Sequence, residues 1–282
     1  MLPPKILLDS LLRSWLLEDI GRGDRTTEGL LQGPVVRSRA QWVAKEAGVI
    51  AGLPIAARVF ELLETEVEFV SLVEEGQSCQ SGQVIAQMVA GLDTLLMGER
   101  VALNLTMRLS GIATTTRQYV ERIADLPVRL VDTRKTTPGL RILEKYATHT
   151  GGAVNHRMGL DDSAMIKDNH IQAAGGIAQA IAKIRNSIPY PLTIEVETTN
   201  IAEVEEAIAQ GADIIMLDNM NSSEMTQAVE LIRGKNCQIK IEASGNITLD
   251  NIREVAKTGI DYISSSAPVT RSHWLDLSMR LG

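Results

Sequence analysis

Short apolar runs alternate with amphipathic stretches through the second half of the chain. The runs predict strands at residues 128–131, 164–166, 192–196, 214–217, 239–241 and 262–264. The spacing between them predicts helices at residues 140–148, 177–188, 201–209, 223–232 and 249–258. Strands and helices in such succession indicate a parallel sheet with right-handed crossovers. The number of units favours a closed or nearly closed α/β barrel, although these strands fall short of the eight in a complete barrel.

The first half of the chain has a different pattern, with shorter and more varied elements. We expect helices at residues 5–19 and 54–63 and strands at residues 37–43, 67–70 and 83–86. These elements predict a small α/β sandwich in roughly the first hundred residues. A long helical stretch follows at residues 93–123, with an interruption expected at Ser110 and Gly111. We therefore place an N-terminal domain at residues 1–112 and a barrel domain at residues 113–282.

Composition is that of an ordinary globular protein, because 44% of the 282 residues are hydrophobic and 22% are charged. A chain of this length suits two domains, or one barrel with an N-terminal addition. Cys79 and Cys237 are far apart and lack metal-ligand spacing, which argues against a disulfide framework or a zinc site. With no signal-peptide pattern and no apolar run of about 18 residues, we expect a cytoplasmic protein that does not bind membranes.

Cationic side chains gather in residues 131–170, where each short strand ends in polar residues. The carboxyl ends of barrel strands are where such folds bind ligands, so these positions indicate a site. The net charge of −7 makes a broad nucleic-acid surface improbable, whereas a local positive basin suits a small anion with phosphates or several carboxylates. The cations are Arg134, Lys135, Arg157 and Lys167, with His149, His156 and His170 nearby.

The later strands end in a different set of side chains. Acids follow or close the strands at Glu195, Glu197, Asp218 and Glu242, and small polar residues occupy 244–245 and 264–266. One edge of the sheet is thus expected to present cations, then acids, then a Ser- and Gly-rich segment before helix N-termini, where backbone N–H groups hold phosphates.

These motifs, in this order and spacing, resemble those of the quinolinate phosphoribosyltransferases, also called nicotinate-nucleotide pyrophosphorylases (carboxylating). The likeness covers nearly the whole chain. Each motif is modest alone, and together they are highly specific. They lie at residues 18–24, 98–100, 109–114, 132–139, 155–157, 166–170, 195–197 and 217–219.

The resemblance implies an N-terminal α/β sandwich joined to an incomplete, open α/β barrel of about six parallel strands. It implies a homodimer, alone or within a higher oligomer. It implies the joining of quinolinate to 5-phosphoribosyl 1-pyrophosphate, with substrate-bound Mg²⁺ and no organic cofactor. The products are nicotinate mononucleotide, pyrophosphate and CO₂, within NAD biosynthesis. Both substrates are polyanions, which agrees with the cationic basin.

The same resemblance implies roles for individual residues. Arg134, His156, Arg157 and Lys167 hold quinolinate, and Lys135 and Lys167 also face the pyrophosphate. Glu197 and Asp218 address the ribose hydroxyls and the metal. The catalytic set is Lys135, Lys167, Glu197 and Asp218, and the remaining substrate contacts are Ser244, Gly245, Asn246, Ser265, Ser266 and Arg271.

Arg100 has two interpretations. Local sequence favours a structural ion pair, because Arg100 follows Glu99 on an apolar helix. The resemblance implies instead that Arg100 crosses the dimer interface to the substrate carboxylates of the partner.

The chain departs from the family pattern at two places. Where many members have Val-Gly-Ala and a later His, residues 264–268 are Ser-Ser-Ser-Ala-Pro and Arg271 follows as a candidate phosphate ligand. His149 occupies a position where Arg or Lys is common.

Three other functions remain open at this point. A sister phosphoribosyltransferase acting on nicotinate without decarboxylation would need fewer cations. A Schiff-base aldolase would use Lys167 as its nucleophile, with a pKa lowered by neighbouring cations. A carrier or interaction module near Gly76 and Gly82 lacks a lysine at a turn tip.

Overall fold

The computed structural model describes residues 2–282, and the chain forms two compact units. The first unit contains the chain up to Arg117 together with Ile142–Gly152 and Arg271–Gly282. The second contains Gln118–Arg141 and Ala153–Thr270. No helix within residues 2–282 combines the length and apolarity needed to cross a membrane.

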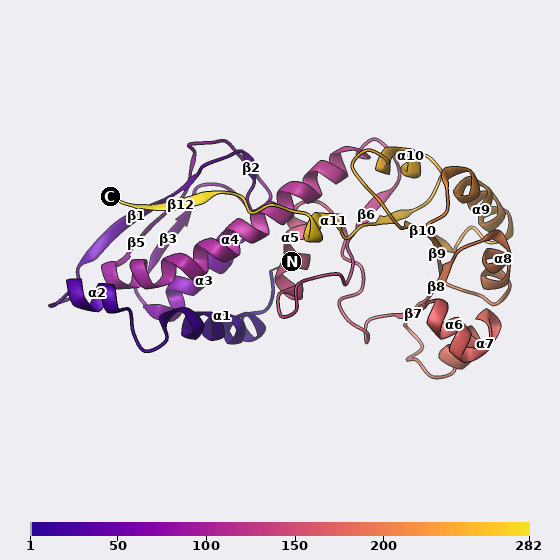
Figure 1. Ribbon diagram of the computed structural model, residues 1–282, viewed down its shortest axis with the longest axis horizontal. Helices are drawn as coiled ribbons and strands as arrows, with labels where there is room; N and C mark the ends of the chain where they lie inside the picture. Colours follow the sequence, from indigo (N-terminus) through magenta and orange to yellow (C-terminus); the bar gives the residue numbers. More distant parts are fainter. Residues whose placement is uncertain (1) are drawn as a thin grey trace. The chain divides into compact units, whose positions relative to one another are not determined.

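The first unit is built on an antiparallel sheet of four strands in the order β12-β1-β5-β3 (Figure 1). Trp42 of β1 meets Phe60 and Phe69 edge to face, with ring centroids 6.4 and 6.0 Å apart, and so joins the sheet to α3. The strands are β1 (Arg37–Ala44), β3 (Glu68–Ser71), β5 (Val84–Gly91) and β12 (Leu277–Leu281), with a separate pair of β2 (Gly48–Val49) and β4 (Ser78–Cys79). The helices are α1 (Lys5–Ile20), α2 (Arg25–Leu30), α3 (Leu53–Leu63), α4 (Leu92–Glu121) and α5 (Arg141–Thr150), of which residues 118–121 and Arg141 belong to the second unit.

Strand β12 returns the end of the chain to the first unit, where it pairs with β1 in a register that sets Leu277 opposite Ala44. Helix α5 also packs in this unit, since Tyr146 donates a hydrogen bond to Glu75. The domain boundary expected between residues 112 and 113 stays a prediction. The compact units differ from it because Ile142–Gly152 and Arg271–Gly282 belong to the first unit. The pairing of β12 with β1 and the contact of α5 with Glu75 have no local sequence signal, because each joins residues that are distant in sequence.

Helix α4 runs without a break through Ser110 and Gly111, so the predicted interruption there is wrong. Ser110 Oγ accepts a hydrogen bond from the backbone N–H of Ala51 at 2.9 Å. A Cβ at position 111 would collide with the carbonyl oxygen of His273. The two residues therefore serve close packing of the helix, and they do not mark its end.

Replacing Gly111 by alanine is expected to destabilise the protein by about 1–3 kcal/mol, because the added methyl must displace backbone. Urea denaturation of the variant measures this change. The matched control is Gly234→Ala in α9, where a Cβ meets no atom within 4 Å and alanine is the better helix former. Equal stabilities for the two variants would contradict the packing role of Gly111.

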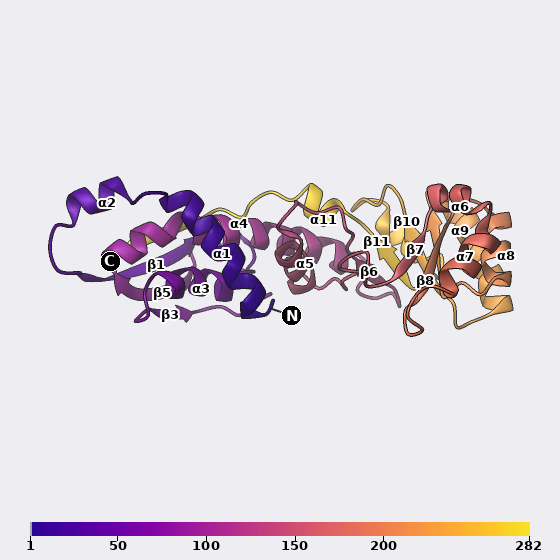
Figure 2. The same ribbon diagram turned by 90° about the horizontal axis from the view of Figure 1, so that it is seen from below.

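The second unit contains a sheet of six parallel strands in the order β6-β11-β10-β9-β8-β7, which confirms the predicted strand number and type. Among the described residues β6 and β7 do not pair with each other, so the sheet is open. The strands are β6 (Arg129–Val131), β7 (Ala164–Ile166), β8 (Ile194–Thr198), β9 (Ile214–Asp218), β10 (Lys240–Ser244) and β11 (Tyr262–Ser264). Helices α6 (Asp168–Ala174), α7 (Ile177–Arg185), α8 (Ile201–Ala209), α9 (Ser222–Lys235), α10 (Ile252–Ala256) and α11 (Ala267–Thr270) connect or follow them (Figures 1 and 2).

Side chains alternate between two faces along these strands. Ile194 and Val196 of β8 and Ile241 of β10 are fully buried in the apolar core shared with the helices. Glu195 and Glu242 have the opposite parity and point to the inner face, where they are also buried. Acidic side chains therefore reach the inner face, and all six strands end at the same edge of it.

Candidate active site

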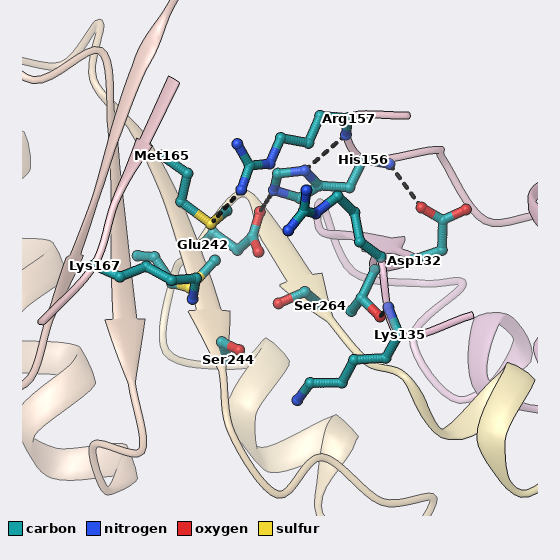
Figure 3. A pocket seen from close by; sticks show the side chains of 12 residues that line it. Asp132, Lys135, His156, Arg157, Met165, Lys167, Glu242, Ser244 and Ser264 are labelled. Carbon is teal, nitrogen blue, oxygen red and sulfur yellow. Dashed lines mark hydrogen bonds and ion pairs between the residues drawn. The ribbon is translucent and has the colours of Figure 1, made fainter. Parts of the chain in front are cut away.

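A cavity of about 230 Å³ lies at the carboxyl edge of the parallel sheet (Figure 3). Four of the six strands, β7, β9, β10 and β11, supply part of its lining, together with the segments that follow β6 and flank β7. The lining side chains are Asp132, Thr133, Arg134, Lys135, His156, Arg157, Met165, Lys167, Met216, Glu242, Ser244 and Ser264. Four of them are cations, which makes the cavity suited to an anion.

Asp132 joins the two loops of the cavity at the end of β6. Its carboxylate is 2% exposed and accepts hydrogen bonds from Asn155 Nδ2 at 2.6 Å and from the backbone N–H of His156 at 2.9 Å. These contacts fix the second loop, so His156 and Arg157 take defined positions.

Arg157 projects along the upper wall of the cavity in Figure 3. Its guanidinium donates to the carbonyl oxygen of Ser163 at 3.0 Å and to Met165 Sδ at 3.6 Å. Burial, with a smaller contribution from Arg134, lowers the pKa of Arg157. The guanidinium still remains charged at neutral pH, because arginine titrates far above it.

His156 lies against two buried acids, Glu195 of β8 and Glu242 of β10. Its Nε2 is 3.1 Å from Glu195 Oε2 and 3.5 Å from Glu242 Oε2. Burial alone would lower the pKa of His156, but hydrogen bonds to Glu195 and Glu242 outweigh it and raise the pKa to about 10. Burial also raises the pKa of Glu195. Because the three side chains titrate together, the raised pKa belongs to the cluster, which holds one proton more than a neutral histidine and two carboxylates.

The same three side chains have the spacing of metal ligands, since one ligand atom from each lies within 4.8 Å of the others. However, His156 Nδ1 accepts a hydrogen bond from the backbone N–H of Arg157 at 2.7 Å. A nitrogen that accepts carries no proton, so the ring proton is on Nε2. Nε2 then has no lone pair for a metal, and we assign the cluster to proton holding.

Lys167 and Glu197 form an ion pair across β7 and β8. The lysine side chain is 42% exposed and lines the cavity, whereas the glutamate is 14% exposed and stands behind it. Figure 3 shows Lys167 and Lys135 on either side of Ser244 and Ser264. Two ammonium groups can therefore approach one ligand from different strands.

Asp218 closes β9 on the rim of the sheet and accepts a hydrogen bond from Asn219 Nδ2 at 2.7 Å. Asn246 Nδ2 in turn donates to Asn219 Oδ1 at 3.1 Å. Asn219 and Asn246 both have left-handed backbones, with φ of 56° and 53°. A side chain at Gly245, where φ is 99°, would collide with Asn219. These turns bring the ends of β9 and β10 together.

The segment after β11 continues the rim. Ser264 lines the cavity, and the backbone N–H of Ser265 donates to the carbonyl oxygen of Val131 at 3.1 Å. Ser265 Oγ accepts from the N–H of Ala267 at 3.2 Å, and Ser266 lies at the start of the short helix α11.

The structure groups the predicted site residues unevenly. The lining contains Arg134, Lys135, His156, Arg157, Lys167 and Ser244. Residues beside the lining are Glu197, Asp218, Gly245, Asn246, Ser265 and Ser266. Arg100 and Arg271 belong to the first unit, where Arg100 is 58% exposed and lies 3.7 Å from Glu99. The roles expected for these residues stay predictions.

Sequence reasoning placed Glu195 and Glu242 among the strand-end acids and Asp132 within a motif, but gave none of the three a role in the site. A sequence signal was present for two of them. Glu195 and Glu197 are two residues apart on β8, and Glu242 and Ser244 are two residues apart on β10, so each pair points to the same face of the sheet. Alternation thus places Glu195 and Glu242 on the face that carries the site. Their pairing with His156 comes from the fold.

Comparison with known proteins agrees with this geometry. Residues 24–110 match the N-terminal domain, and residues 112–280 the C-terminal domain, of quinolinate phosphoribosyl transferase. The chain is 62% identical over 280 residues to a probable nicotinate-nucleotide pyrophosphorylase (carboxylating) of Synechocystis sp., covering 99% of this chain and 94% of the relative. It is 37% identical to a quinolinate phosphoribosyltransferase (decarboxylating) of Nicotiana tabacum, covering 99% and 83%.

A solved structure gives the same result. NadC from Streptococcus pyogenes superposes with a TM-score of 0.94 at 41% identity, covering 100% of this chain and 99% of that one. Both domain matches and these relatives span nearly the whole chain. The chain therefore belongs to the quinolinate phosphoribosyltransferase family.

Proposed function

We propose that this protein transfers the phosphoribosyl group of 5-phosphoribosyl 1-pyrophosphate to quinolinate with loss of CO₂. The products are nicotinate mononucleotide and pyrophosphate, as a step of NAD biosynthesis. The observation that carries this proposal is the cavity at the sheet edge, whose lining includes Arg134, Lys135, Arg157 and Lys167. A dicarboxylate and a pyrophosphate both need such a concentration of cationic donors.

Quinolinate is proposed to occupy the part of the cavity near Arg134, Arg157 and Lys167, with His156 in its floor. A guanidinium matches a carboxylate with two parallel N–H bonds, and an ammonium adds a point charge. Each charge-assisted bond contributes about 1.5–3 kcal/mol. The two ring carboxylates are thereby distinguished from the single one of nicotinate.

Phosphoribosyl pyrophosphate is proposed to lie along the rim, with Lys135 and Lys167 toward its pyrophosphate. The remaining proposed contacts are Ser244, Gly245, Asn246, Ser265, Ser266 and Arg271. This substrate would bring Mg²⁺ with it. Glu197 and Asp218 close adjacent strands and offer carboxylate oxygens, which are ligands that this hard cation accepts.

The residues suit a reaction that needs charge stabilisation and no covalent nucleophile. Loss of pyrophosphate leaves an oxocarbenium-like ribosyl centre, which Glu197 and Asp218 can stabilise. Lys135 and Lys167 balance the charge that develops on the leaving group. After the ring nitrogen attacks, its positive charge stabilises the electron pair that departing CO₂ leaves on C2, and C2 then takes up a proton from water. Mg²⁺ supplies Lewis acidity to the leaving group when bound.

We further propose a homodimer, alone or within a higher oligomer, in which each Arg100 completes the pocket of the other subunit. The supporting observations are the exposure of Arg100 and its weak partner, Glu99 at 3.7 Å. The cytoplasm is the proposed location, because the two cysteines are free.

Two of the alternative functions have less support. Nicotinate would leave part of the cationic set without a carboxylate partner, which is costly in a half-buried site. A Schiff-base lysine must be free to attack a carbonyl, whereas Lys167 is held in an ion pair with Glu197. Supplying quinolinate and nicotinate separately with phosphoribosyl pyrophosphate tests this choice, and turnover of nicotinate alone would contradict the proposal.

The variants Glu197→Gln and Asp218→Asn are expected to lower kcat more than they raise KM for quinolinate. Each removes a carboxylate that acts on the ribosyl cation and its metal, while the cationic contacts to quinolinate remain. Steady-state kinetics with each substrate varied measures both parameters. A rise in KM for quinolinate with an unchanged kcat would mean that these acids hold quinolinate.

A further inference from the structure

Both ring nitrogens of His156 are engaged within the protein. Nδ1 accepts the backbone N–H of Arg157 at 2.7 Å, and Nε2 faces Glu195 Oε2 and Glu242 Oε2 at 3.1 and 3.5 Å. The side chain is 14% exposed. The ring thus borders the cavity while its hydrogen-bonding atoms point away from any ligand in it.

The tautomer follows from these contacts. Because Nδ1 accepts, Nε2 carries the ring proton and directs it toward Glu195 and Glu242. Glu195 and Glu242 are 0% and 4% exposed, and Oε1 of each has no hydrogen-bond partner among residues 2–282. Burial raises the pKa of Glu195, so the extra proton of the cluster is placed on that carboxylate, which leaves His156 Nδ1 able to accept.

Arg157 is consequently held at both ends. Its backbone N–H bonds to His156, and its guanidinium bonds to Ser163 O and Met165 Sδ. The backbone anchor depends on the orientation of the imidazole, and that orientation depends on Glu195 and Glu242. A rotation of the ring about χ2 would remove the acceptor from Arg157.

We propose that His156 serves quinolinate recognition indirectly, as a positioning residue that aims Arg157, with Glu195 and Glu242 fixing the imidazole in the required tautomer. This inference rests on the proposed function, since Arg157 is assigned to quinolinate. Binding energy at a charged contact depends on placement within a fraction of an ångström. The ring supplies that placement and makes no hydrogen bond to the substrate.

A double-mutant cycle between positions 156 and 157 tests the proposal. His156→Gln keeps an N–H donor for the acids and loses the Nδ1 acceptor. It is expected to lower kcat/KM for quinolinate about 10-fold in the presence of Arg157, and less than about 2-fold in an Arg157→Ala background. KM for phosphoribosyl pyrophosphate should stay within about 2-fold of wild type. This separates misplacement of Arg157 from distortion of the whole site. Equal fold-losses in both backgrounds would show that His156 contacts quinolinate independently and would overturn the proposal.

The acids are tested by a rescue. Glu195→Leu removes the acceptor for Nε2 and is expected to raise KM for quinolinate about 10-fold, whereas Glu195→Gln keeps an oxygen acceptor and should recover to within about 3-fold of wild type. If Glu195→Gln is as impaired as Glu195→Leu, the tautomer argument is overturned. If Glu195→Leu fails to fold, the double-mutant cycle at positions 156 and 157 still tests the role of His156. Wild-type turnover of quinolinate is the reference throughout. Its absence would overturn the proposed function and this inference together, while an additive cycle in an active enzyme overturns only the role of His156.

Discussion

Arg157→Ala and Arg134→Ala are each expected to lower kcat/KM for quinolinate by at least about 100-fold, which corresponds to about 2.7 kcal/mol. Both guanidinium groups line the cavity, and the fork of Arg157 is fixed by Ser163 O and Met165 Sδ. Truncation removes a charge-assisted contact and leaves a desolvated carboxylate without a partner, which costs more than the bond itself contributes. Steady-state kinetics with quinolinate varied at saturating phosphoribosyl pyrophosphate measures the loss.

Arg185→Ala is the matched control for this prediction. Arg185 also lies in the second unit, where its guanidinium donates hydrogen bonds to the Asp213 carboxylate and to the carbonyl oxygen of Gly211. These two partners precede the first residue of β9, so the contact is at the end of the strand opposite the carboxyl edge. An exposed ion pair of this kind contributes about 0–1 kcal/mol to stability and should leave kcat/KM within about 2-fold of wild type. Wild-type kinetics in Arg134→Ala and Arg157→Ala would remove both residues from the site.

Mixing two inactive variants is expected to restore activity if Arg100 serves the partner subunit. Arg100→Ala and Lys167→Ala homodimers should each be nearly inactive. A heterodimer of the two contains one site with both residues intact, so it should reach about half the wild-type rate. The two chains carry different affinity tags, are dissociated and re-associated together, and the doubly tagged species is purified and assayed.

The pair Arg157→Ala and Lys167→Ala provides the negative control. Both residues come from the same unit of one chain, so a heterodimer of these variants has no intact site and should stay inactive. A verified heterodimer of Arg100→Ala and Lys167→Ala without recovered activity would place Arg100 in its own subunit's site or outside any site. Lowered thermal stability of Arg100→Ala without loss of activity would instead favour the structural ion pair with Glu99.

The parallel sheet was predictable because its strands carry continuous apolar runs and its helices a clear period. The strand expected at residues 214–217 is Ile214–Asp218 in the structure. The strand expected at residues 239–241 is Lys240–Ser244, which extends further at its polar end. Three of the cavity cations were also predictable, since Arg134, Lys135 and Lys167 follow strand ends and such ends share one edge. The residues that line the cavity therefore include Arg134, Arg157 and Lys167, as expected.

The features that escaped prediction depend on contacts between distant residues. Strand β12 has no strong pattern of its own and forms because β1 has a free edge. Gly111 looked like a helix break and is instead a point of close approach to His273. Glu195 and Glu242 looked like ordinary strand-end acids, and only the fold brings both to His156.

The most direct test of the account is a mass balance on purified protein. Quinolinate labelled in its 2-carboxylate is incubated with phosphoribosyl pyrophosphate and Mg²⁺, and nicotinate mononucleotide, pyrophosphate and labelled CO₂ are quantified together. The account predicts the three products in a 1:1:1 ratio, with none formed when either substrate is omitted. Pyrophosphate release without labelled CO₂, or turnover of nicotinate in place of quinolinate, would contradict it.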